Sequence, residues 1–237
     1  MNYFKSQLLL TILICAQLGS PFSYAKTNTI SIYSDEVVTD IILPEALCNI
    51  SDSYEGHIIS DFLTKQRENV SKENASYLPE ALGIIGKCEG YEDLLYPWGY
   101  IVMLPNSKYT NTQEKYNKYI TKYMASQQDV LGEFIEKLVQ DIDKSGIVEG
   151  DHGMELDEFE MGKFKVIKTT DNAIHLLTII SFELNGIASK EVATMSQQIR
   201  GDQVLTIYLY DQLENITDAL RRVNSIDETL KITNIIN

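Results

Sequence analysis

Positive charge and histidine are scarce in this sequence. Its 237 residues include 20 lysines and arginines against 34 aspartates and glutamates, which gives a formal net charge of −14. A surface this acidic repels the phosphates of nucleic acids and of anionic lipids, so we expect neither as a partner. The three histidines, His57, His152 and His175, do not have the spacing of a zinc motif, and we expect them to be structural or exposed rather than catalytic.

The motifs of several enzyme classes are absent as well. The chain has no Gly-x-Ser-x-Gly nucleophile elbow, no glycine-rich phosphate loop, no dinucleotide fingerprint and no His-Glu-x-x-His. Carboxylates are abundant, but a catalytic pair cannot be selected among so many from the sequence alone. The sequence therefore favours a non-catalytic accessory or binding protein. A hydrolase that uses carboxylates of the acidic segment is an alternative.

Long apolar runs are missing beyond the first residues. Lys5 is followed by the short apolar run from Leu8 to Ile14, and Ser23 and Ala25 place small residues where a signal peptidase cleaves. The run is too short to span a bilayer, so we expect residues 1–25 to be a cleaved signal peptide. The mature chain is then exported, to the periplasm or the extracellular space, and the remaining residues 26–237 fit one domain.

Only two cysteines, Cys48 and Cys88, remain after that cleavage. In an exported protein, an isolated pair most simply forms one disulfide. Two free thiols are the alternative, but neither cysteine has a histidine at a persuasive spacing and no Cys-x-x-Cys is present. The third cysteine, Cys15, lies in the expected signal peptide, where the large Ile14 before it is a poor fit to lipoprotein processing.

Turn chemistry divides the C-terminal third of the chain into β-type runs. Residues 163–168, Ile174 to Leu184 and Val204 to Tyr210 are rich in β-branched and aromatic residues. The dipeptides Asn185-Gly186 and Gly201-Asp202 suit two-residue hairpin turns, so antiparallel pairing is expected. A polar run leads from the first of these turns to the second. Further β-type runs are expected at residues 29–43, 82–88 and 96–104.

Three stretches have the periodicity of amphipathic helices. They span Tyr54 to Val70, Asn111 to Lys144 and Asn215 to Ile232. In the long middle stretch, five apolar or aromatic residues recur at helical spacing: Tyr116, Tyr119, Ile120, Tyr123 and Met124. We expect this stripe to face a sheet, and a partner-binding groove is the alternative. Between this helix and the strands, residues 146–162 are strongly acidic and are expected to form a surface loop.

This order of elements predicts an α+β fold, an antiparallel sheet packed by amphipathic helices in a layered sandwich. The strand pair Ile174–Leu184 and Val204–Tyr210, followed by the closing helix Asn215–Ile232, resembles the PsbP-like architecture, which small exported bacterial proteins of the DcrB type share. The resemblance implies a binding or accessory factor rather than an enzyme. It identifies no functional residue, because no residue motif supports it.

One segment has the spacing of a calcium loop. Oxygen-bearing side chains fall at positions 1, 3, 5 and 9 of an EF-hand: Asp141, Asp143, Ser145 and Glu149. Position 12, which should be a bidentate glutamate, is His152. A calcium-responsive binding protein is therefore an alternative function, with calcium as its cofactor. A helix end at Gly146 followed by a solvated acidic loop explains the same residues without a metal.

The single tryptophan lies among tyrosines. Trp98 is flanked by Tyr96 and Tyr100, a cluster that would suit an exposed platform for a sugar or a peptide. The edge of a core is the alternative, because large amphipathic rings also gather where a core meets water. The partner of the expected binding protein, a protein or a small molecule, is not identified by these residues.

Overall fold

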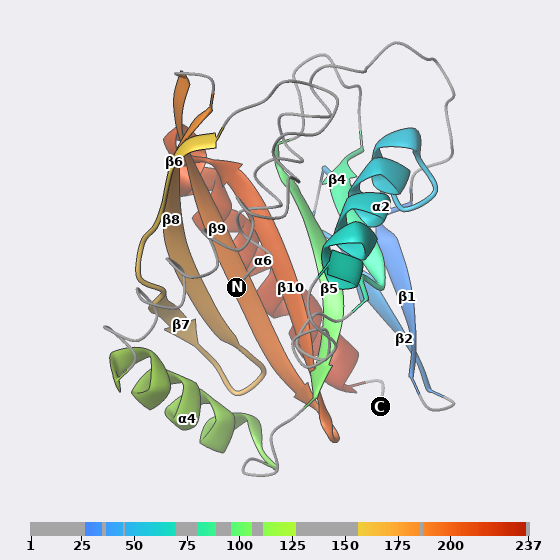
Figure 1. Ribbon diagram of the computed structural model, residues 1–237. Coiled ribbons are helices and arrows are strands. Elements are labelled where there is room, and N and C mark those ends of the chain that lie inside the picture. Colours follow the sequence, from blue (N-terminus) through green and yellow to red (C-terminus); the bar gives the residue numbers. More distant parts are fainter. Residues whose placement is uncertain are drawn as a thin grey trace.

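A computed structural model describes most of the chain after its first segment (Figure 1). The described residues are 27–34, 37–44, 46–69, 80–88, 96–105, 111–126, 156–184 and 187–235. Their elements are β1 (Thr29–Ser34), β2 (Val37–Ile42), β3 (Leu47–Asn49), α2 (Tyr54–Asn69), β4 (Gly83–Lys87), β5 (Trp98–Pro105), α4 (Gln113–Ser126), β6 (Leu156–Met161), β7 (Lys165–Thr169), β8 (Ile174–Leu184), β9 (Ile187–Arg200), β10 (Gln203–Gln212), the 3₁₀ turn η1 (Leu213–Asn215) and α6 (Ile216–Ile235).

The main sheet is antiparallel, as the hairpin turns predict. Its strands lie in the order β3-β4-β5-β10-β9-β8-β6, and β7 also pairs with β8 (Figure 1). The turn between β9 and β10 contains Gly201, whose φ of +60° lies in the left-handed region that glycine tolerates. Strands β1 and β2 form a separate antiparallel hairpin. The α+β class with an antiparallel sheet is therefore confirmed.

The polar run between the two turn pairs forms β9, a central strand of the sheet. It pairs with β8 on one side and with β10 on the other. Several of its polar side chains are buried, namely Glu191, Thr194, Ser196, Gln197 and Gln198. Composition alone does not predict a strand here, because buried strands usually consist of apolar residues and these polar groups need partners from other elements.

The end of the acidic segment differs from its expected loop structure. Residues Leu156–Met161 form β6, an edge strand whose main chain pairs with β8. An edge strand is held by main-chain hydrogen bonds and leaves one side free, so acidic residues do not prevent it from forming. The expectation of a loop throughout residues 146–162 is therefore wrong for β6, and residues 146–155 lie outside the described part of the chain.

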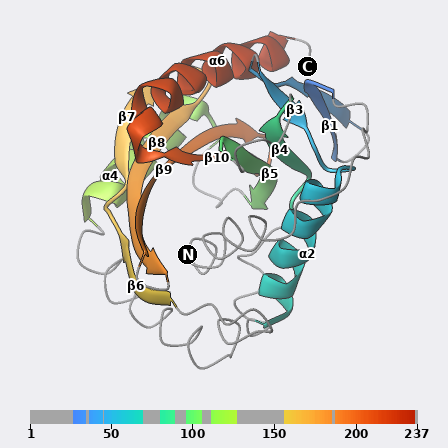
Figure 2. The same cartoon turned by 90° about the horizontal axis from the view of Figure 1, so that it is seen from above.

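The two faces of the sheet are covered by different elements. Helix α6 and the β1–β2 hairpin cover one face, where Ile226 and Leu230 of α6 pack with Ile207 of β10. Helices α2 and α4 cover the other face, α2 against β4 and α4 against β7 and β9. Figure 2 shows α6 on one side of the curved sheet and α2 on the other. The core therefore has two layers, one on each face.

The helices follow the predicted positions more closely than the predicted faces. Helix α2 agrees with the expected span, whereas the described part of the middle helix ends at Ser126. In α4, Tyr116 and Ile120 are buried and Met124 packs against their cluster, whereas Tyr119 and Tyr123 are exposed. Three of the five residues of the expected stripe therefore lie on the sheet side. The sheet-facing side of α4 contacts β7 and β9. No helix among the described residues is long and apolar enough to cross a membrane.

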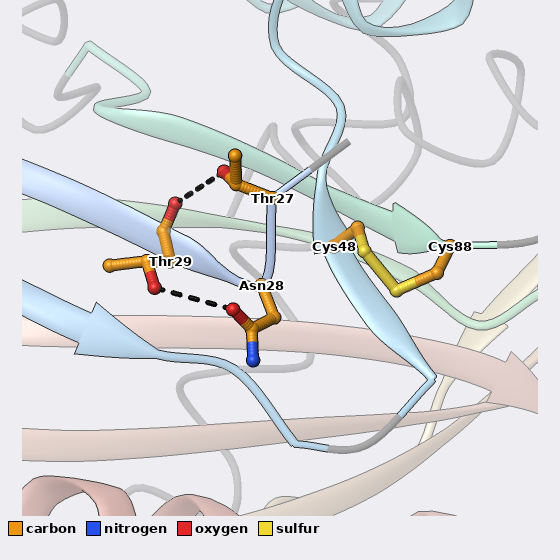
Figure 3. Close-up of a disulfide and its surroundings, with 5 residues drawn as sticks. All are labelled: Thr27, Asn28, Thr29, Cys48 and Cys88. Carbon is orange, nitrogen blue, oxygen red and sulfur yellow. Dashed lines mark hydrogen bonds between the residues drawn. A yellow bond between two sulfur atoms is a disulfide. The ribbon is translucent and has the colours of Figure 1, made fainter. Parts of the chain in front are cut away.

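The predicted disulfide is present. Cys48 in β3 is bonded to Cys88, which directly follows β4, and Figure 3 shows the bond beside the start of β1. β3 and β4 are also neighbours in the sheet, and the Asn49 amide nitrogen donates to the Thr27 carbonyl oxygen at 2.6 Å. The bond therefore joins an edge strand to its partner and helps to hold the first strands against the sheet.

Replacing both cysteines with alanine should lower the free energy of unfolding by about 3–4 kcal/mol. The bond closes a loop between residues 40 positions apart, and the lost loop-closure entropy of the unfolded chain gives that magnitude. Urea unfolding followed by circular dichroism measures it. Reduction of the unmodified protein should produce the same loss, and equal stability of oxidised and reduced protein would contradict the expectation.

Candidate functional site

A serine, a histidine and an aspartate meet beneath α6. His175 of β8 lies opposite Ser196 of β9 in the strand register, and its Nδ1 is 2.8 Å from Ser196 Oγ. Its Nε2 is 3.2 Å from Oδ1 of Asp227, which comes from α6. The relative exposure is 0% for His175, 1% for Ser196 and 6% for Asp227. They therefore form a buried polar chain that crosses from the sheet to the helix.

Hydrogen-bond chemistry fixes the direction of this chain. An ionised Asp227 can only accept, so His175 donates from Nε2 and accepts the Ser196 hydroxyl hydrogen at Nδ1. Burial lowers the pKa of His175 below its usual value, against the opposite influence of the Asp227 hydrogen bond. The imidazole is therefore neutral at neutral pH, which agrees with the hydrogen-bond directions.

Two further groups complete the bonding of Asp227. Thr170 Oγ1 donates to its Oδ1 at 2.8 Å, and Lys168 Nζ lies 2.8 Å from its Oδ2. Burial alone would raise the pKa of Asp227, but hydrogen bonds from Lys168, Thr170 and His175 lower it below its usual value. A carboxylate this well bonded stays ionised and holds α6 to β7 and β8.

The order serine, histidine, aspartate is that of a nucleophilic triad, in which the histidine removes the serine proton. A nucleophile must also reach a substrate carbonyl, and the Ser196 side chain is covered. Each polar side-chain atom of Ser196, His175 and Asp227 already has a partner inside the protein. The arrangement is therefore suited to fastening α6 to the sheet, and the expected structural role of His175 agrees with it.

A second buried acid lies on the opposite face of the sheet. Glu191 of β9 is 2% exposed and accepts a hydrogen bond from the Tyr96 hydroxyl group. Burial, together with the negative charge of Asp211 nearby, raises the pKa of Glu191 to about 8. Glu191 is thus mainly protonated at neutral pH.

Asp211 is neutralised differently, by a cation from α6. It accepts hydrogen bonds from Arg222 and, at 3.2 Å, from the Asn215 side-chain amide. Two ion pairs therefore connect α6 to the sheet, Arg222 with Asp211 and Lys168 with Asp227. These two carboxylates, with Ser196 and Glu191, did not stand out in the sequence. For Ser196 and Glu191, the signal that was available is the polar composition of the run between the two turn dipeptides, whereas Asp211 and Asp227 lie outside that run.

The aromatic cluster around Trp98 lies in the core and does not form the exposed platform that was one expectation. Trp98 and Tyr100 are 1% and 0% exposed, and only Tyr96 is partly exposed. Trp98 stacks on Tyr210 with 4.4 Å between ring centroids, and Tyr100 stacks on Tyr208 at 4.7 Å. Neighbouring positions on β5 and β10 bring these rings together on one face. They form the core layer under α2 instead of a surface.

The predicted calcium ligands cannot be located in this fold. Asp141, Asp143, Ser145 and Glu149 lie outside the described residues, as does His152. Among the residues that the structure does describe, no group of three or more histidine, cysteine, aspartate or glutamate side chains is placed to hold a metal ion. The calcium site remains a prediction from the sequence.

Glu191→Gln should remove a pH dependence of stability. The raised pKa means that the folded state keeps a proton that the unfolded chain loses above a pH of about 4.5, so stability declines as pH rises from there through about 8. Glutamine is neutral at every pH and can still accept from Tyr96. We compare the unfolding free energy of Glu191→Gln with that of wild type at each pH. From about pH 5 to about pH 9, this difference should change by about 2–4 kcal/mol in favour of the variant.

Denaturant unfolding of both proteins across that range measures the shift. Glu228→Gln, a change at an exposed glutamate of α6, is the control and should leave the pH profile unchanged. Only the change of the free-energy difference with pH is compared. A loss of stability that the glutamine amide causes equally at every pH therefore does not affect the result. Parallel profiles for Glu191→Gln and wild type would show that Glu191 is ionised in the folded protein.

Comparison with known proteins identifies no family for this chain. No protein-family model matches the chain, and no curated protein matches it. Matching solved structures include the Saccharomyces cerevisiae Ran-binding protein Mog1p and a mutant of Mog1, each 8% identical with a TM-score of 0.34, covering 86% of this chain and 92% of the matched one. A TM-score this low supports no argument about fold or function. The expected PsbP-like or DcrB-like resemblance is wrong, because these matches are to Mog1 and no likeness to either is shown.

Proposed function

We propose that the protein is an exported, non-catalytic binding protein that acts in the periplasm or outside the cell. The observation that carries this proposal is the disulfide between Cys48 and Cys88. Disulfides persist in oxidising compartments, whereas the reducing cytosol keeps most thiols free. A bond that joins neighbouring strands of the main sheet supports folding in such a compartment.

The sequence supports export independently of the disulfide. Residues 1–25 combine a basic start, a short apolar run and small residues before the cleavage point, which is the order of a signal peptide. These residues lie outside the described part of the chain, so the signal peptide is part of the proposal. The absence of nucleic acid as a partner is likewise a prediction from the net charge of −14.

Binding is favoured over catalysis by how the reactive side chains are used. Ser196, His175 and Asp227 bond to one another inside the protein, and Glu191 bonds to Tyr96. Each of these groups therefore stabilises the fold through an internal contact. A rigid, disulfide-linked sheet with helices on both faces is a suitable scaffold for a surface that recognises a partner.

Expression of the full chain in a host with a bacterial envelope tests the proposal. The purified product should begin after Ala25 and should leave the cytoplasm, and both remaining cysteines should resist alkylation until a reductant is added. N-terminal sequencing gives the cleavage point, cell fractionation gives the location, and intact mass after alkylation gives the state of the cysteines. The matched control is Leu9→Arg with Leu13→Arg, which interrupts the apolar run and should leave an uncleaved, reduced protein in the cytoplasm. An uncleaved wild-type chain with free thiols would overturn the proposal.

A further inference from the structure

The outer face of α4 carries two exposed aromatic rings. Tyr119 and Tyr123, one helical turn apart, are 42% and 38% exposed. Their rings stack on each other with 6.0 Å between centroids and 23° between planes. Tyrosine is enriched where proteins meet, because its ring offers a large contact area and its hydroxyl remains able to hydrogen-bond.

Lysines surround these two rings. Lys115, Lys118 and Lys122 occur at the same helical spacing and are exposed, so they share the outer face with Tyr119 and Tyr123. Helix α4 also contains Glu114, whose Oε1 forms an exposed ion pair with Lys118 Nζ at 2.6 Å. Three lysines and one glutamate give the helix a net charge of +2. We call these five residues, 115, 118, 119, 122 and 123, the lysine–tyrosine face. Aromatic groups flanked by charges have the arrangement of a protein interface, an apolar centre with a polar rim.

The inner face of α4 fixes this surface in place. Gln113 bonds to the main chain of β9, donating to the Gln197 carbonyl oxygen at 3.3 Å and accepting from the Ile199 amide nitrogen at 2.8 Å. Asn117 donates to the Thr170 carbonyl oxygen at 2.9 Å, and the buried Tyr116 donates its hydroxyl hydrogen to Gln197 Oε1 at 3.0 Å. Because the helix is already anchored, a partner that binds its outer face loses little free energy in ordering it.

Local charge determines which partner this face attracts. The chain as a whole carries −14, but charges are screened beyond about 8 Å at physiological ionic strength. The 14 residues of α4 extend about 21 Å at 1.5 Å per residue. A partner on α4 therefore responds mainly to the charges of α4 itself. Beside the helix, the exposed Lys165 of β7 adds a positive charge and the exposed Asp171 after β7 adds a negative one.

We propose that the lysine–tyrosine face is the docking surface for an acidic polypeptide, in which apolar or aromatic side chains alternate with carboxylates. The carboxylates pair with Lys115, Lys118 and Lys122, and the apolar side chains pack on the two tyrosine rings. This deepens the binding function proposed above and names the chemistry of its partner. In this proposal, the exposed pair Tyr119 and Tyr123 is the part of the α4 stripe that contacts a partner.

A labelled random copolymer of glutamate and tyrosine is the probe for this proposal. Fluorescence anisotropy with the purified, oxidised mature protein should show saturable binding that salt weakens. The triple variant Lys115→Glu, Lys118→Glu and Lys122→Glu should bind the copolymer about tenfold more weakly or worse, as three lost rim pairs imply. The double variant Tyr119→Ser and Tyr123→Ser should lose a similar factor through its missing contact area.

Matched controls separate the face from general charge. Lys87→Glu, Lys190→Glu and Lys231→Glu make the same change in net charge on β4, β9 and α6, and Tyr54→Ser removes an exposed tyrosine from α2. These controls should bind like wild type. Circular dichroism and thermal melting confirm that every variant is folded before its binding is compared.

Four results would overturn the proposal. They are absence of copolymer binding to wild type, equal loss in the charge controls, binding to anionic phospholipid vesicles in place of the copolymer, and a wild-type dimer in sedimentation that the α4 variants dissociate. The last two would assign the face to a membrane or to a second copy of the chain. The binding assay uses purified protein and does not depend on export. A failure of copolymer binding can therefore be told apart from a failure of export.

Discussion

Buried polar side chains on a central strand are the constraint on which this structure depends. A buried polar group without a partner costs about 1–3 kcal/mol, and a buried charge costs more. Strand β9 places Ser196 and Gln198 toward α6, where His175 and the Leu230 carbonyl oxygen receive their hydrogen bonds. It places Glu191 on the other face, beside Tyr96. The position of α6 therefore follows from polar pairing as well as from apolar burial.

The two buried clusters make opposite demands on pH. The lowered pKa values of His175 and Asp227 mean that their contribution to stability is complete above the usual histidine range and declines as pH falls. The raised pKa of Glu191 has the reverse effect, because its contribution is complete in acid and is lost as pH rises through about 8. Acidification therefore weakens the cluster of His175 and Asp227, whereas a rise in pH weakens the contribution of Glu191.

The sequence predicts the hairpins and helix positions well because turn dipeptides and periodicity are local signals. Asn185-Gly186 and Gly201-Asp202 lie at the ends of β9, and Cys48 and Cys88 form the expected bond. Periodicity does not show how much of an amphipathic stripe a sheet can cover, which is why Tyr119 and Tyr123 were expected inside. Nor does it show the partners of buried polar groups, because Asp227 lies 52 residues from His175 and meets it only in the folded chain.

The interior uses its reactive groups for stability, whereas the exposed outer face of α4 carries the proposed docking surface. We expect the polar contacts of Asp227 and Asp211 to make α6 one cooperative unit with the sheet. Native-state hydrogen exchange tests this most directly, residue by residue. Amides of Val223 to Leu230 in α6 and of Val192 to Gln198 in β9 should open with free energies that agree within about 1 kcal/mol. If α6 opened at a much lower free energy while β9 stayed protected, the claim would be contradicted.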